Sequence, residues 1–232
     1  MSKVLLFSSG LDSFIAWHFL SKPPCLHITG HSRYSFHELV TIHGIRLHTP
    51  DMKLKIVDWR DWLKEFEEPD ANIPLRNAHF AMVAAHFGNT VYMPCQRGEQ
   101  EIPDRSPRFF NMISELISYL SGREVKVVPV FPDMTKQDMV SWYINQGLFK
   151  EELYHTYSCF SGEIVRCGEC SACFRTAVAL DYNNILPDKF FTKDIWSWEG
   201  ITGYVERLKD EKYEQRRAEQ TKQVLRNRNF LI

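Results

Sequence analysis

Short apolar runs alternate with amphipathic stretches along the first 150 residues of the chain. The apolar runs lie at residues 3–7, 25–28, 55–57, 90–93 and 125–128, and all are short enough to be buried strands. Between them, helical spacing of apolar residues predicts helices over 14–20, 36–47, 59–66, 77–87, 109–120 and 135–146. This alternation predicts an α/β fold, with a doubly wound parallel five-stranded sheet covered by helices on both faces.

Several of these elements carry signals for their ends. Thr135 is the expected N-cap of the helix over 135–146, because Asp138 stands three residues later and Gly147 follows the helix. Gly88 is the expected C-cap of the helix over 77–87. Residues 94–108 are polar and include Pro103 and Pro107, and this composition predicts a loop.

The chain after residue 150 has a different character. A helix is predicted over residues 174–180, and residues 204–230 are strongly charged with helical spacing. The arginines and lysines of this last stretch could contact a nucleic acid, but a solvated surface helix is the favoured interpretation.

Composition adds a few limits. The formal net charge of the 232 residues is -1, so no overall field attracts the protein to nucleic acid or membrane. No apolar run approaches the roughly 20 residues that cross a bilayer. We therefore expect a soluble, cytoplasmic protein without a membrane partner, in which cysteines remain reduced.

Small polar residues separate the first predicted strand from the first predicted helix. The segment Ser8–Ser13 reads Ser-Ser-Gly-Leu-Asp-Ser. The amide groups at such a helix start can bind a phosphate, Gly10 lets the backbone come close to it, and the serine hydroxyls can donate hydrogen bonds. Asp12 could hold Mg²⁺ or simply cap the helix, and an ordinary capped helix is the alternative for the whole segment. The Walker form is excluded because no Gly-Lys-Ser/Thr follows.

Four of the six cysteines lie close together near residue 165. Cys167, Cys170 and Cys173 are three residues apart, and Cys159 stands eight residues before them. Thiolates at this spacing converge on one ion, and Gly168 allows the turn, so a closed structural Zn²⁺ site is expected. A redox pair, a disulfide or an iron–sulfur cluster are the alternatives. Cys25 and Cys95 are isolated and are expected to be buried small apolar residues.

These motifs divide the chain. We expect a nucleotide-binding domain over residues 1–150 and a zinc-binding, helical C-terminal region over 151–232.

The loop and the cysteines together resemble a known family. Ser8–Ser13 is similar to the Ser-Gly-Gly-x-Asp-Ser loop of the PP-loop ATP pyrophosphatases, with Ser9 in place of a glycine. Further along, 74–77 (Pro-Leu-Arg-Asn), Pro103-Asp104 with Phe109, Thr135-Lys136 and the cysteine run resemble, in order, segments of the 7-cyano-7-deazaguanine synthase (QueC) family. If Ser9 must adopt a positive φ, its replacement of glycine costs about 1 kcal/mol or more.

The resemblance implies a fold, an activity and a set of site residues. The fold would be like that of the adenine nucleotide α-hydrolases, and the reaction would convert 7-carboxy-7-deazaguanine and ammonia to 7-cyano-7-deazaguanine (preQ0) with ATP and Mg²⁺. ATP would bind within 7–17, and Zn²⁺ would bind Cys159, Cys167, Cys170 and Cys173. The catalytic candidates are Asp12, Arg76 and Lys136. The ATP-binding candidates are Phe7, Ser8, Ser9, Gly10, Leu11, Asp12 and Ser13. A homodimer is also implied, and a nucleic-acid partner is not expected.

The departures from the family pattern gather in residues 95–108. Arg105-Ser106 replaces a Cys-Arg pair, and Arg108 replaces a glutamate before Phe109. Because this stretch is expected to shape the pocket for the base, the acceptor is less well defined than the use of ATP. The alternatives are a PP-loop ligase acting on another carboxylate or amide, in a protein or a nucleic-acid base, and an inactive nucleotide-binding module.

Overall fold

The structure is a computed structural model that describes residues 2–30, 32–59, 65–68, 73–163, 165–210 and 213–231. Its strands are β1 (Lys3–Leu6), β2 (Cys25–Thr29), β3 (Leu54–Asp58), β4 (Thr90–Gln96) and β5 (Lys126–Phe131). The helices of the same part are α1 (Leu11–Phe19), α2 (Ser35–His48), α3 (Arg76–Ala85), α4 (Pro107–Ser121) and α5 (Lys136–Asn145). The C-terminal helices are α6 (Lys150–Leu153), α7 (Ser171–Tyr182), α8 (Ile201–Arg207) and α9 (Gln215–Asn227). The 3-10 turn η2 (Pro103–Arg105) lies between β4 and α4, and the 3-10 turn η3 (Ile195–Ser197) lies between α7 and α8.

The predicted sheet is confirmed. Five parallel strands lie in the order β3-β2-β1-β4-β5, so the strand order reverses between the neighbours β1 and β4. In such a sheet the crossover helices on the two sides of the reversal pack on opposite faces, which leaves a crevice at the carboxyl ends of the two central strands. This topology decides where a ligand can enter.

Helices cover both faces, as the apolar pattern predicts. Along the first strand, side chains alternate between two cores. Leu5 and Phe7 pack with α1, α2 and α5 on one face, whereas Val4 and Leu6 pack with α3 and α4 on the other. Because both faces are covered, β1 is apolar at every position from Val4 onward.

The helix ends agree with the predictions only in part. The capping box of α5 is present: Asp138 N donates to Thr135 Oγ1 at 3.2 Å, and Thr135 N donates to Asp138 Oδ2 at 3.1 Å. Gly88, in contrast, is not the cap of α3. That helix ends at Ala85, and a Cβ at Gly88 would lie 3.0 Å from the Ser2 carbonyl oxygen, so the glycine permits close packing instead.

The structure differs from two further sequence-based expectations, and a third lies mostly outside the described residues. The loop predicted over 94–108 begins later, because β4 continues through Gln96 and η2 forms at Pro103. The single helix predicted over 204–230 is two helices, α8 and α9. The helix predicted over 59–66 has residues 60–64 outside the described part of the chain.

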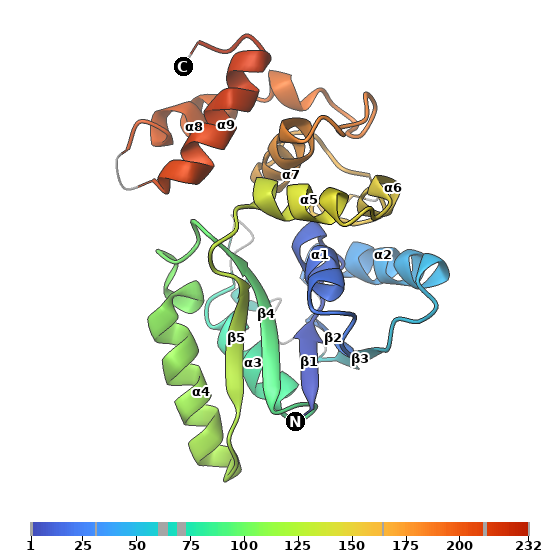
Figure 1. The fold of residues 1–232 in the computed structure, drawn as a ribbon, viewed down its shortest axis with the longest axis vertical. Coiled ribbons are helices and arrows are strands. Elements are labelled where there is room, and N and C mark those ends of the chain that lie inside the picture. The colour runs from blue at the N-terminus through green and yellow to red at the C-terminus, as the bar shows by residue number, and fades with distance from the viewer. Residues whose placement is uncertain are drawn as a thin grey trace.

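The C-terminal helices form a third apolar cluster. Phe174 and Ala177 of α7 pack with Ile201 and Tyr204 of α8 and with Leu225 of α9. Figure 1 shows these helices gathered beyond the end of the sheet at which the strands finish. The interpretation of 204–230 as a solvated surface helix is therefore wrong for one face of α9, which is buried against α7. The division of the chain near residue 150 stays a prediction.

Candidate functional site

A cavity of about 280 Å³ opens at the reversal of strand order. Its wall comes from the carboxyl ends of β1, β2 and β4, from the first turns of α1, α2 and α3, and from the segment before α7. Segments that are distant in the sequence thus meet at the position where ligands bind in open α/β sheets.

The predicted phosphate loop forms one wall. Phe7, Ser8, Gly10, Asp12 and Ser13 line the cavity. Ser13 Oγ donates to the Gly10 carbonyl oxygen at 3.0 Å and accepts from Ser8 N at 3.3 Å, so the loop closes on itself before α1 begins. The first amides of α1 have no acceptor within the helix and carry its positive dipole end, which suits an anion.

Ser9 and Leu11 lie behind this wall. Leu11, the first residue of α1, is buried in the core. Ser9 is fully buried with φ of 62°, in the left-handed region, and its Oγ has no hydrogen-bond partner among the described residues. The positive φ considered for Ser9 on sequence grounds is therefore present. Its side chain does not line the cavity.

Two of the predicted catalytic side chains are in direct contact. Lys136, the first residue of α5, forms an ion pair with Asp12 of the phosphate loop, and both line the cavity. They lie 124 positions apart in the sequence. The sheet brings them together, since α1 follows the central strand β1 and α5 follows β5, where the Met134 carbonyl oxygen before α5 accepts from Arg97 N just after β4.

Arg76, the third predicted catalytic residue, lines another part of the cavity. It begins α3, after Leu75 with φ of 63°, and its Nη1 donates to Tyr34 Oη at 2.6 Å. Glu38 of α2 lines the same side of the cavity. Burial raises the pKa of Glu38 to about 8, and the Arg76 guanidinium offsets this only in part. The carboxyl group is therefore mostly protonated at neutral pH and can donate a hydrogen bond.

Residues 95–108, which depart from the family pattern, also contribute side chains to the cavity wall. Glu99 is buried, pairs with Arg105 at 2.6 Å, and accepts from Gln96 Nε2 at 3.2 Å. Burial favours a higher pKa for Glu99, but the charges of Arg105, Arg175 and Lys136 outweigh it and hold the pKa below its usual value. Gln96 Oε1 is buried and has no partner among the described residues.

Sequence reasoning missed Glu38 and Arg175 as cavity residues, whereas Gln96, Glu99 and Arg105 belong to residues 95–108, which were expected to shape the pocket and do line it. Among these charged residues, only Glu99 follows closely on a predicted strand, six residues after residue 93. A charged residue at such a distance is a weak signal on its own, since solvated loops show it too.

The four clustered cysteines converge. Their sulfur atoms all lie within 4.8 Å of one another. Cys159 Sγ is 3.5 Å from Cys167 Sγ, which is 3.9 Å from Cys173 Sγ. A tetrahedral Zn²⁺ with bonds of about 2.3 Å would separate its sulfur ligands by about 3.8 Å. This donor set therefore fits a closed four-thiolate metal site. All six cysteines are free, which excludes a disulfide in this conformation.

Gly168 is required by this turn. Its φ is +77°, and a Cβ there would lie 2.2 Å from the Lys193 carbonyl oxygen. The cluster also adjoins the cavity, since Cys159 is part of both and Arg175 follows Cys173 by two residues. Cys25 and Cys95 are buried as expected, and burial raises the pKa of Cys95 to about 12.

An α/β sheet with a phosphate loop at its reversal and a four-cysteine cluster beside the same cavity defines a class of nucleotide-binding proteins. Comparison with known families is more specific. The family described as "Queuosine biosynthesis protein QueC" matches residues 31–184, about two thirds of the chain, and the chain belongs to this family. The matched range begins after the phosphate loop and ends before α8.

Curated relatives agree with this assignment. The chain is 27% identical over 123 residues to a 7-cyano-7-deazaguanine synthase of Pseudoalteromonas atlantica, covering 53% of this chain and 55% of the relative. It is 30% identical over 119 residues to one of Methanothermobacter thermautotrophicus, covering 49% and 52%. The chain thus spans about half the length of the curated relatives it matches.

A solved structure is also similar. The U34-tRNA thiolase NcsA from Methanococcus maripaludis, with its [4Fe-4S] cluster, matches with a TM-score of 0.41 and 15% identity, over 89% of this chain and 71% of that one. Among the described helices, none is both long enough and apolar enough to cross a membrane.

Proposed function

We propose that this chain converts 7-carboxy-7-deazaguanine and ammonia to 7-cyano-7-deazaguanine with ATP. One observation carries the proposal: the phosphate loop, Arg76, Lys136 and the edge of the cysteine cluster line a single cavity. The family assignment supplies the chemistry, and the cavity supplies both an anion-binding loop and a set of polar groups for a second ligand.

ATP would bind with its phosphates at the start of α1. The amides of the first turn after Leu11 and the hydroxyl of Ser8 would donate to phosphate oxygens, the Ser13 hydroxyl would do so after leaving the Gly10 carbonyl oxygen, and Gly10 would let the backbone approach. A Cβ at Gly10 would lie 3.2 Å from Ser158 Oγ, so a larger residue there would require the Ser158 side chain to shift.

Asp12 and Lys136 would act together on the phosphates. Mg²⁺ bound at Asp12 would neutralise phosphate charge as the α–β bond breaks. Lys136, released from its partner, would then contact the phosphates themselves. The ion pair between these two residues holds both side chains at the cavity wall.

The acid would bind on the side of Arg76 and Glu99. A deazaguanine presents N–H donors and a carbonyl acceptor, together with the carboxylate that reacts. Gln96 Oε1, a buried acceptor without a partner among the described residues, suits an N–H group of the base. Glu38 can donate to the ring carbonyl, and Arg76 can hold the carboxylate.

The chemistry needs two activations. The carboxylate attacks the α-phosphorus of ATP, giving an acyl-adenylate and pyrophosphate. Ammonia displaces AMP from the acyl carbon and, after losing a proton, leaves the amide. The amide oxygen then attacks the α-phosphorus of a second ATP and releases a second pyrophosphate, and loss of AMP and of the two nitrogen-bound protons leaves the nitrile. Around these steps the protein supplies positioning and cationic groups for the developing charge.

The cysteine cluster would hold Zn²⁺ and have a structural role. A closed four-thiolate site offers no open position for substrate. It would fix the segment before α7, with Tyr157 and Ser158, and the start of α7, with Arg175, at the cavity. Ser158 Oγ accepts from Leu11 N at 3.3 Å, so this segment also braces the phosphate loop.

One observation favours a second candidate, a ligase of the same build with a different acid or amide. Arg105, which stands in the Cys-Arg position of the family pattern, forms a buried pair with Glu99 in the cavity wall. A polar pocket discriminates strongly between substrates that satisfy its groups and those that do not.

The test is a substrate assay with the purified full chain, ATP, Mg²⁺, ammonia and 7-carboxy-7-deazaguanine, read by mass spectrometry. We expect the nitrile, with Lys136→Ala lowering its rate at least a hundredfold and the exposed-site control Lys126→Ala leaving it unchanged. ATP consumption with another acid but no nitrile would favour the second candidate. ATP binding without any turnover would indicate an inactive nucleotide-binding module and refute both.

A further inference from the structure

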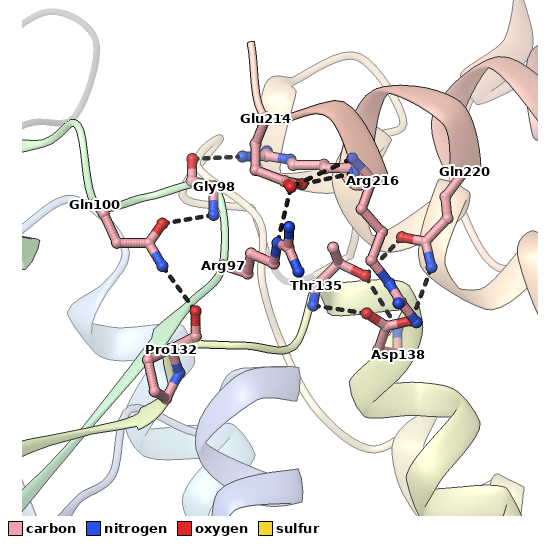
Figure 2. A network of polar contacts seen from close by, with 10 residues as sticks. Arg97, Gly98, Gln100, Pro132, Thr135, Asp138, Glu214, Arg216 and Gln220 are labelled. Carbon is pink, nitrogen blue, oxygen red and sulfur yellow. Dashed lines mark hydrogen bonds and ion pairs between the residues drawn. The ribbon is translucent and has the colours of Figure 1, made fainter. Parts of the chain in front are cut away.

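Helix α9 lies outside the range matched by the family, yet its first two turns are bonded to two segments of the cavity wall. One segment is the turn after β4, at Arg97 and Gly98. The other is the start of α5, at Thr135 and Asp138. Figure 2 shows the polar network that joins them.

The bond to the first segment is made by Glu214. Its carboxylate caps α9 by accepting from Arg216 N at 3.2 Å and Arg217 N at 2.7 Å. The same carboxylate accepts from Arg97 Nε at 2.7 Å. Gly98 lies close to α9 as well, because its carbonyl oxygen accepts from Arg217 Nη1 at 3.2 Å. A side chain at Gly98, where φ is +84°, would meet Arg217 Cδ at 3.1 Å.

The bonds to the second segment come mainly from Gln220, a buried residue six positions after Glu214. Gln220 Oε1 accepts from Thr135 Oγ1 at 2.6 Å, and Gln220 Nε2 donates to Asp138 Oδ1 at 2.8 Å. Arg216 Nη2 reaches the same carboxylate oxygen at 2.8 Å. Gln220 thus binds both members of the α5 capping box, which are the residues on either side of Lys136.

Both anchored segments carry groups that face the cavity. Gln96 and Glu99 flank the Arg97–Gly98 turn, and Lys136 follows Thr135 directly. The segments are also joined to each other, since Arg97 N donates to the Met134 carbonyl oxygen at 2.9 Å. Movement of α9 would therefore displace Gln96 and Glu99 together with Lys136, the cation beside the phosphate loop.

We infer that Glu214 and Gln220 are positioning residues of this site. Glu214 fixes the turn that carries Gln96 and Glu99, and Gln220 fixes the α5 start that carries Lys136. Neither residue lines the main cavity. The catalytic consequence rests on the proposed function, whereas the mechanical link does not.

The chain offers a matched control on the same helix. Arg228, just past the end of α9, makes a bidentate ion pair with Asp181 of α7, at 2.9 and 2.6 Å. This pair holds α9 to α7 without touching either wall segment. Arg228→Ala therefore removes a contact of α9 of similar kind and leaves the network at its beginning intact.

The experiment measures backbone amide hydrogen exchange in the full chain for Glu214→Ala, Gln220→Met and Arg228→Ala. Glu214→Ala should speed exchange in residues 96–100 about tenfold, and Gln220→Met should do so in residues 135–139, because each loses a hydrogen bond that closes the segment. Arg228→Ala should leave both segments unchanged. Unchanged exchange in the first two variants, an increase spread evenly over the sheet, or an equal increase in Arg228→Ala would overturn the inference.

A kinetic measurement separates positioning from simple loss of structure. With the nitrile assay, Glu214→Ala should raise the KM for the acid at least fivefold with little change in kcat, and Gln220→Met should mainly lower kcat. Equal kinetics for all three variants would refute the positioning role. If the wild-type chain makes no nitrile, the proposed function fails and the exchange data still decide whether α9 holds the wall.

Discussion

Replacement of Ser9 by glycine should stabilise this protein, although Ser9 lies in the phosphate loop. The residue has φ of 62°, is fully buried, and has a hydroxyl without a partner among the described residues. Its side chain also lies behind the cavity wall. The substitution therefore removes two unfavourable features without removing a group that faces the cavity.

The expected gain follows from three contributions. A left-handed backbone costs a non-glycine residue about 1 kcal/mol. A buried hydroxyl without a partner costs about 1 kcal/mol or more. Glycine's greater freedom in the unfolded chain offsets roughly 0.5–1 kcal/mol of this. The net gain for Ser9→Gly is then about 1 kcal/mol, and for a chain of this length that raises Tm by about 2–4 °C.

Ser21 provides a matched control. It also has a positive φ, of 60°, but it is exposed. Ser21→Gly relieves the backbone alone, so its Tm should rise by less than about 2 °C. Calorimetric unfolding measures both variants, and titration with ATP checks the loop. A Tm for Ser9→Gly at or below that of Ser21→Gly would refute the reasoning, and weaker ATP binding would show that the hydroxyl contacts the nucleotide.

Three further changes test the site. Cys170→Ser should abolish bound Zn²⁺, expected at about one per chain by metal analysis, because three thiolates and a hydroxyl hold the ion poorly; a folded wild-type protein without metal would contradict this. Glu38→Gln should flatten the pH dependence of the urea midpoint. The pKa of Glu38 is raised from 4.5 to about 8 in the folded protein, so the wild type binds the extra proton and loses stability as pH rises through that window; an equal slope in the variant would disprove the assignment. Arg105→Ala should destabilise by about 1–3 kcal/mol, since Glu99 would remain buried with only Gln96 and the charges of Arg175 and Lys136 beside it, whereas Lys126→Ala on the surface should change stability by less than about 0.5 kcal/mol; equal urea midpoints for the two would refute the role of the ion pair.

Local signals were sufficient for the sheet and for the convergence of the four cysteines. The apolar run at residues 3–7 is followed by small polar residues and a helix, and this order is itself the geometry of a phosphate loop in a parallel sheet. Likewise, Cys167, Cys170 and Cys173 are close enough in the sequence to converge on one point whatever the rest of the chain does. Thr135 and Asp138 predicted a capping box for the same reason, since the interaction spans three residues.

Interactions between distant segments could not be predicted from such local signals. Gly88 looked like a helix cap, but the backbone of Ser2 beside it explains the glycine. The stretch over 204–230 looked like a solvated helix because charge dominates its composition, while the few apolar residues that decide its burial depend on α7. Glu38, Glu99 and Arg105 are ordinary charged residues until the sheet places them around one cavity.

The α/β class, the position of Ser8–Ser13 between the first strand and the first helix, and the four converging cysteines could be predicted from the sequence, because each depends on residues that are neighbours or follow a fixed spacing. The packing of the whole chain is needed to bring Asp12 to Lys136, to place the Glu99–Arg105 pair in the cavity wall, and to bond α9 to that wall through Glu214 and Gln220. The Asp12–Lys136 pair joins residues 124 positions apart, and the bonds of Glu214 to Arg97 and of Gln220 to Thr135 span 117 and 85 positions. Their partners are chosen by how the helices pack beyond the carboxyl ends of the strands, and no local pattern encodes that choice.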